Sequence, residues 1–186
     1  MVRAVVISVW AVVLGLHVAL SARTLGTLVV PAGEGADYFL GDVRAAAVRA
    51  AVDHLRRAAW PGATLAVLPG GVSINYLARL RNPTPYVEFS PFEAKLFSEE
   101  TMAASIRASR PDFVAVVSSD FVEYGYRAFG DDFGLGLSRW IAANYAVATV
   151  IQPMDGDFQI TIGTRRGRNG RRGQVGPEDG PSRPGR

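Results

Sequence analysis

The chain opens with an uncharged apolar run, residues 4–22, in which only His17 can titrate. As an α-helix rising about 1.5 Å per residue, this run approaches the roughly 30 Å hydrocarbon core of a bilayer. It is longer than the apolar region of about 7–15 residues that is typical of a cleaved signal peptide. We therefore predict a retained transmembrane helix, or an uncleaved signal anchor, over residues 1–24. A secretory signal peptide is the alternative, and Arg3 and Arg23 flank the run too evenly to set its orientation.

The next segment, residues 25–164, is amphipathic and predicts one soluble domain. The whole chain is 48% hydrophobic, which is enough to build a core, and it has no cysteine. The lack of cysteine excludes disulfide scaffolds, zinc–thiolate sites and thiol nucleophiles. The two histidines, His17 and His54, are too few for a histidine metal site. The sequence therefore predicts neither a metal site nor a cofactor.

The positive charge of the chain belongs to its last segment, residues 165–186. The net charge is +3, yet this segment alone has seven arginines against Glu178 and Asp179. Its glycine, proline and polar residues leave nothing to bury, so we predict a disordered tail. Within the domain, aromatic and cationic residues do not interleave, and nucleic-acid binding is therefore not predicted. Contact of the tail with anionic lipid or nucleic acid stays open beside a purely solvated tail.

Apolar patterning predicts an α/β domain. In the helix predicted over residues 41–60, for example, Val48, Val52 and Leu55 recur at spacings of three and four. Short apolar runs bounded by turn residues predict buried strands. Predicted helices cover 41–60, 72–80, 98–109 and 134–145, and predicted strands cover 63–68, 86–89, 112–117, 146–153 and 158–164. This alternation predicts a small α/β sandwich with a mostly parallel sheet. Asp155-Gly156 is a favoured two-residue turn, so the fold is expected to end in a β-hairpin.

A glycine turn after the strand predicted at 63–68 is the first candidate site. Gly70 and Gly71 would present backbone N–H groups at the start of a helix, where anions bind. Ser73 and Asn75 are the side chains expected beside such a ligand. The turn matches neither a Walker A loop nor a GxGxxG fingerprint. The alternative is that the glycines only form the turn and that the two polar side chains cap the helix.

The loop after the strand predicted at 112–117 is the second candidate site. If the two strands are neighbours, this loop lies beside the glycine turn. Asp120 and Glu123 would then be paired carboxylates suited to acid–base or metal chemistry. A carboxylate three residues before another is also the pattern of a helix N-cap with its capping-box partner. The sequence leaves both interpretations open.

Several motifs together resemble one family of membrane proteins. They are PGATLAVLPGGVSINYL (61–77), Arg79, Arg81-Asn82-Pro83, Pro111-Asp112-Phe113-Val114, Glu123-Tyr124-Gly125, Phe129-Gly130 and WIAANY (140–145). This set resembles the C-terminal soluble portion of bacterial multi-pass proteins similar to glycosyltransferases that use lipid-linked sugars. These belong to the GT-C class, of the protein O-mannosyltransferase and aminoarabinose-transferase type. The resemblance covers roughly residues 3–165, with the opening helix as the last membrane span.

The resemblance implies an extracytoplasmic accessory domain without catalysis of its own. In that class the catalytic acid lies on an early extracytoplasmic loop between membrane helices that this chain does not have, so no catalytic residue is transferred onto it. Implied partners are membrane lipid, the transmembrane part of the larger protein, and a lipid-linked sugar or its acceptor. Because residues 1–3 lead straight into the span, we expect a truncated or mis-started product. Two other functions stay open: a free-standing anchored or secreted module that binds an anion at Gly70-Gly71, and a small hydrolase that uses Asp120 and Glu123.

Overall fold

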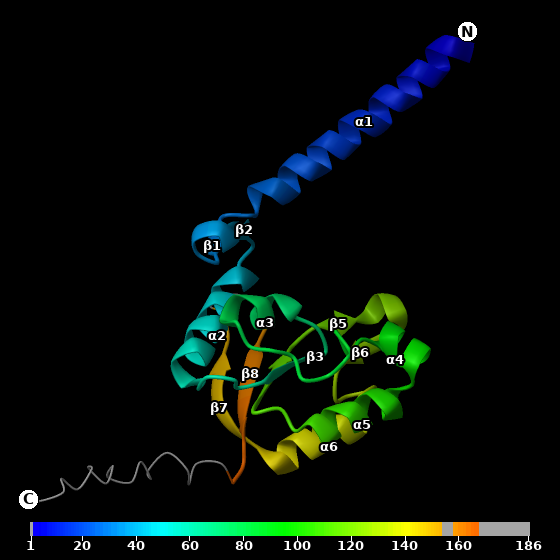
Figure 1. The fold of residues 1–186 in the computed structure, drawn as a ribbon. Helices are drawn as coiled ribbons and strands as arrows, with labels where there is room; N and C mark the ends of the chain where they lie inside the picture. Colours follow the sequence, from blue (N-terminus) through cyan, green and yellow to red (C-terminus); the bar gives the residue numbers. More distant parts are fainter. Residues whose placement is uncertain (1, 154–157, 168–186) are drawn as a thin grey trace, which may run out of the picture.

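A single long helix and an α/β domain make up the chain in the computed structural model, which describes residues 2–153 and 158–167 (Figure 1). Helix α1 (Val2–Gly26) runs for 25 residues, and none of its side chains is buried. It is long and apolar enough to cross a membrane. Three residues then lead into the domain. The predicted tail, residues 168–186, and the turn residues 154–157 lie outside the described residues.

The centre of the domain is a four-stranded sheet in the order β3-β4-β8-β7. The strands are β3 (Leu65–Leu68), β4 (Phe113–Val117), β7 (Tyr145–Ile151) and β8 (Ile160–Arg165). The strands predicted at 63–68, 112–117, 146–153 and 158–164 therefore form, and the last two pair antiparallel as the expected hairpin.

The expectation of a mostly parallel sheet is not confirmed. Strands β3 and β4 pair in parallel, whereas β4 with β8 and β8 with β7 pair antiparallel. Three strands, β3, β4 and β7, do run in the same direction, as helix-linked strands should. Strand β8, however, returns from the hairpin and takes the place between β4 and β7. The second strand of a hairpin must run opposite to the first, so this insertion makes both of its pairings antiparallel.

Helices cover both faces of the sheet and give three layers (Figure 1). They are α2 (Arg44–Ala58), α3 (Val72–Ala78), α4 (Pro91–Phe97), α5 (Glu99–Ser109) and α6 (Leu135–Asn144). Successive strand residues point to opposite faces, and each face has its own apolar core. Phe113 and Ala115 of β4 pack in the core beneath α2 and α3. Val114, between them, packs in the core that Met102 of α5 and Leu137 of α6 complete.

A small hairpin that the sequence did not predict connects α1 to the domain. Strand β1 (Val30–Ala32) pairs antiparallel with β2 (Phe39–Gly41) around the 3₁₀ turn η1 (Gly35–Asp37). Ala32 is fully buried, and β1 packs against α2. The Asp37 carboxylate accepts a hydrogen bond of 2.6 Å from the Tyr76 hydroxyl. The hairpin is thereby fixed to the body of the domain.

The strand predicted at 86–89 is wrong: this segment has no strand. Side-chain hydrogen bonds shape a turn instead, as asparagine and threonine commonly do. The Asn82 amide donates to the carbonyl of Tyr86 at 2.7 Å, and its oxygen accepts from the Thr84 N–H at 3.0 Å. The Phe89 N–H then donates to the Pro69 carbonyl, which holds the segment against the glycine turn.

Candidate functional site

The two loops singled out by the sequence lie side by side at one edge of the sheet. Strands β3 and β4 are parallel neighbours, with Leu68 opposite Val116, so both loops leave from the same edge. A Cβ atom on Gly71 would lie 3.4 Å from the Val117 side chain at the end of β4. The expected proximity of the two loops is therefore confirmed.

The two glycines of the first loop differ in backbone conformation and in the space around them. Gly71 has a φ of +130°, which L side chains rarely adopt, and a Cβ there would lie 2.9 Å from Val67 Cγ1. Gly70 faces a carboxylate: its Cβ position lies 3.6 Å from the carboxyl group of Glu88. An anion approaching this turn would therefore meet a negative charge.

A second carboxyl group, that of Glu93, lies near Glu88. Burial raises the pKa of Glu93, in α4, and the nearby charge of Glu88 raises it further, although a backbone hydrogen bond from Glu88 acts in the opposite direction. Glu93 Oε2 is buried, and no group in the described part of the chain forms a hydrogen bond with it. Glu88 thus places an acidic side chain beside the glycine turn, which makes the turn a poorer anion site than its sequence indicates.

Ser73 and Asn75 have separate roles in the structure. Asn75 is 8% exposed, and its Nδ2 donates to the carbonyls of Leu65 at 2.9 Å and Leu80 at 3.1 Å. Its amide therefore joins β3 to the end of α3 and is occupied in holding the fold. Ser73 is exposed on α3. The structure does not bring the two side chains together on one ligand position.

The second loop forms a short hairpin, β5 (Asp120–Phe121) and β6 (Tyr126–Ala128), around the 3₁₀ turn η2 (Val122–Tyr124). Asp120 lines an open cavity of about 460 Å³ together with Arg44, Arg127 and four other residues. Glu123 is exposed in η2 and does not line that cavity.

Asp120 and Glu123 are therefore not brought together over one cavity, and the paired-carboxylate interpretation gains no support from this arrangement. Among residues 2–153 and 158–167, no group of three acidic, histidine or cysteine side chains could hold a metal ion.

A larger cavity, about 730 Å³, lies at the opposite edge of the sheet, where the amino end of β4 meets the carboxyl end of β8. Four arginines and an aromatic pair dominate its wall. The lining residues are Arg107, Arg110, Trp140, Ala143, Asn144, Tyr145, Arg165, Arg166 and Gly167. We call this the arginine pocket.

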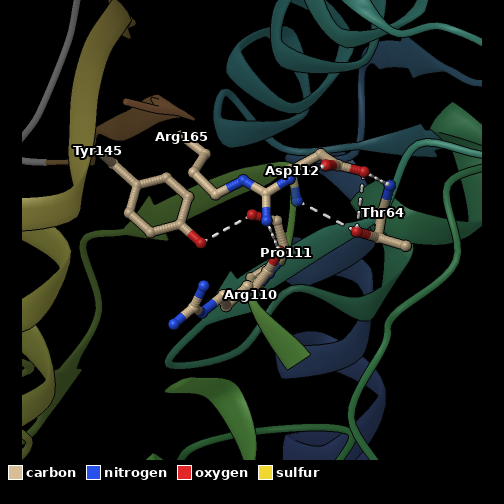
Figure 2. Close-up of polar contacts among 6 residues, drawn as sticks. All are labelled: Thr64, Arg110, Pro111, Asp112, Tyr145 and Arg165. Atoms are coloured by element: carbon tan, nitrogen blue, oxygen red, sulfur yellow. Dashed lines mark hydrogen bonds and ion pairs between the residues drawn. The ribbon is translucent and has the colours of Figure 1, made fainter. Parts of the chain in front are cut away.

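Arg165 anchors one wall of the arginine pocket. Its Nη2 donates to Asp112 Oδ1 at 2.9 Å, and its Nη1 donates to the Arg110 carbonyl at 3.0 Å. The Thr64 N–H donates to the other oxygen of Asp112 at 3.0 Å. Figure 2 shows Arg165 and Tyr145 both directed at the segment 110–112. Asp112 thus links the start of β4 to β3 and to β8.

Tyr145 and Trp140 form the aromatic wall. The Tyr145 hydroxyl donates to the Pro111 carbonyl at 2.7 Å, and burial raises the pKa of Tyr145 to about 12. The Trp140 ring meets the Tyr145 ring edge to face at 5.7 Å. Each ring of this wall is therefore held in place before any ligand arrives.

Sequence reasoning missed the arginine pocket, because its residues come from segments far apart in the chain. The concentration of arginine from residue 165 onward was the available signal. Arg165, however, is the last residue of β8 rather than the start of the tail. No family model, curated protein or solved structure matches this chain.

Proposed function

We propose that this chain is an extracytoplasmic accessory domain, anchored by α1, of a glycosyltransferase-like membrane protein that uses a lipid-linked sugar. The observation that carries the membrane part is α1 itself: its apolar side chains are exposed along its whole length and find no cover in the domain. An uncovered apolar surface of this size is stable only in lipid or against other apolar helices.

The part of the domain next to α1 supports the same proposal. Five large apolar side chains in or beside the β1–β2 hairpin are between 42% and 67% exposed; we call them the apolar rim: Val29, Tyr38, Phe39, Leu40 and Val43. Tyrosine and other amphipathic rings favour the interface between lipid and water. Asp37 pairs with Arg79 and Tyr76, so the rim is rigidly joined to the domain. It would rest on the bilayer or on neighbouring membrane helices.

The accessory role rests on the resemblance described above, which implies catalysis by residues of a larger membrane part. The loop edge that carries Gly70, Gly71 and Asp120 lies at the same end of the sheet as Arg44, the first residue of α2, and β1 packs against α2. Acceptor or lipid-linked sugar bound near the membrane would meet this edge first.

Anchoring is tested with charge placed in α1. In the double variant Val12→Arg, Leu14→Arg, each arginine at the centre of a span costs about 2.5–3.5 kcal/mol of insertion free energy. We expect the variant to leave the membrane fraction, whereas Ala22→Arg, near the helix end where the side chain reaches water, stays. A wild-type chain that an alkaline wash releases from membranes would contradict the proposal.

The side of the membrane is tested by labelling, because the chain has no cysteine. Ser73→Cys places one thiol on the exposed side of α3. A membrane-impermeant maleimide added to intact cells should label this variant and leave the wild type unlabelled. Labelling only after cell lysis would place the domain in the cytoplasm.

The accessory role is tested on the native protein. An antibody against the domain should detect it in a membrane protein much larger than 19.9 kDa, or bound to one after mild detergent extraction. A 19.9 kDa protein that purifies alone would contradict the role. So would transfer of sugar from a lipid-linked donor by the purified chain.

A further inference from the structure

We propose that the arginine pocket binds a phosphate-bearing ligand, with the phosphate held by Arg110 and Arg166 and the remainder of the ligand against Trp140. This site lies at the opposite end of the sheet from α1 (Figure 1), and the proposal does not depend on the accessory function argued above.

The charge of the pocket points to an anion. Four arginine side chains line it, and two acidic partners are bound to them: Asp112 to Arg165, and Glu100 to Arg107. Among the residues that the structure describes, the other two arginines of the pocket therefore have no counter-ion. The carboxyl ends of α5 and α6 also face the pocket and contribute roughly half a negative charge each. Because that total is smaller than the remaining positive charge, the pocket stays cationic.

Arg110 and Arg166 carry this remaining charge. Both side chains are exposed, and neither has an ion pair or side-chain hydrogen bond within the described part of the chain. Arg107 and Arg110 lie at the carboxyl end of α5, where the helix dipole favours cations. Arg166 follows strand β8, so a helix dipole of its own element does not explain its presence. A guanidinium group presents a planar fork of N–H donors that matches two phosphate oxygens.

The wall is organised before binding. Arg165 holds the Arg110 carbonyl, and the Arg166 N–H donates to the Asn144 carbonyl at 2.8 Å. The main chains of both proposed phosphate-binding arginines are therefore fixed. Trp140 is held edge to face by Tyr145 and presents a partly exposed ring on which a sugar or base could stack.

The first experiment follows Trp140 fluorescence. The chain has three tryptophans, so Trp10→Phe with Trp60→Phe leaves Trp140 as the only reporter in the full-length protein. Titration with inorganic pyrophosphate should change its emission. The double variant Arg110→Gln, Arg166→Gln should weaken binding by about tenfold or more, as expected for lost charge-assisted hydrogen bonds.

Two controls separate the pocket from general positive charge. Arg49→Gln with Arg57→Gln removes two exposed arginines from α2 and should leave pyrophosphate affinity within about twofold. A chain that ends at Gly167 lacks the five arginines of residues 168–186 and should still bind. Binding that survives the pocket variant, or that disappears with the tail, would overturn the proposal.

The source of the phosphate is distinguished by a second ligand. Vesicles of phosphatidylglycerol present the same group on a lipid surface. Pyrophosphate binding that the pocket variant loses, together with no effect of the vesicles on Trp140 emission, assigns a soluble phosphate ester. Because the full-length chain also binds vesicles through α1, the readout is again Trp140 emission: a change on adding these vesicles that the pocket variant lacks and pyrophosphate reverses assigns a lipid headgroup. Lys substitutions at Arg110 and Arg166 keep the charge but lose the fork, and should restore only part of the affinity.

Discussion

Arg165 Nη2 lies 2.9 Å from Asp112 Oδ1, and this contact joins the last residue of β8 to the residue that precedes β4. Asp112 is 6% exposed and also accepts a hydrogen bond from the N–H of Thr64. One carboxylate therefore fixes the ends of three strands.

Substitution of this carboxylate should strongly destabilise the domain. Asp112→Asn removes the charge that balances Arg165, and breaking one side of a buried pair costs about 3 kcal/mol. Urea unfolding of the full-length chain in detergent micelles measures the change. Glu100→Gln is the matched control, because Glu100 is 79% exposed in its pair with Arg107 and should contribute less than about 1 kcal/mol. Equal effects of the two variants would contradict a structural role for Asp112.

Gly71 is expected to be the intolerant glycine of the first loop. Gly71→Val places a branched side chain at a φ of +130° and 2.9 Å from Val67, which should reduce the free energy of unfolding by about 3 kcal/mol. Gly70→Ala makes only an ordinary contact of 3.6 Å with Glu88 and should cost less than about 1 kcal/mol. Thermal melts of both variants test this order, and a tolerated Gly71→Val would refute it.

The pKa of Glu93 predicts a stability that falls as pH rises. Burial is the main cause that raises its pKa above the ordinary value of 4.5; a backbone hydrogen bond from Glu88 opposes this and the charge of Glu88 adds to it, so folding favours the protonated acid. Above that value the unfolded state releases its proton first, and the folded state loses stability until its own pKa is passed. Glu93→Gln should therefore be more stable than wild type near neutral pH and equal to it in acid. Parallel stability curves from about pH 4 to about pH 8 would contradict this.

The pKa of Tyr145 predicts how the stability of the domain changes at alkaline pH. Its pKa is raised from 10.0 to about 12, mainly by burial. Stability should hold up to pH 10 and decrease as the pH rises toward 12, because the unfolded chain ionises first. Tyr145→Phe should remove that decrease and cost about 1–2 kcal/mol at neutral pH, since the Pro111 carbonyl loses its donor. A Phe variant with the same alkaline decrease would assign the effect to another group.

Local patterns were enough to locate most elements. The uncharged run predicted α1, and short apolar runs predicted β3 and β4, because burial on both faces leaves continuous apolar sequence. The position of β8 between β4 and β7 was not readable, since strand order depends on contacts between distant segments. The strand prediction for residues 86–89 was wrong for another reason: the Asn82 side chain forms a hydrogen bond with the Tyr86 carbonyl that a neighbouring strand would otherwise form.

The candidate sites show the same division. Adjacency of the loops after β3 and β4 followed from the parallel arrangement of two successive strands. The residues that surround those loops could not be predicted in this way, because Glu88 lies beside Gly70 and comes from a turn that the sequence had assigned to a strand. The arginine pocket required Arg110, Trp140 and Arg165 to converge, and no local spacing connects them.

Only Thr27, Leu28 and Val29 separate α1 from β1. Fully extended, three residues span about 10 Å, so a domain anchored by α1 stays within a thin layer above the lipid. A short tether of this kind gives the domain an effective concentration on the order of millimolar relative to groups at the membrane surface. Contacts too weak to detect between freely diffusing proteins would then be occupied much of the time. With α1 in a membrane as proposed, a partner in the same membrane would be met by lateral diffusion in two dimensions, and the domain would need little affinity of its own to remain beside it.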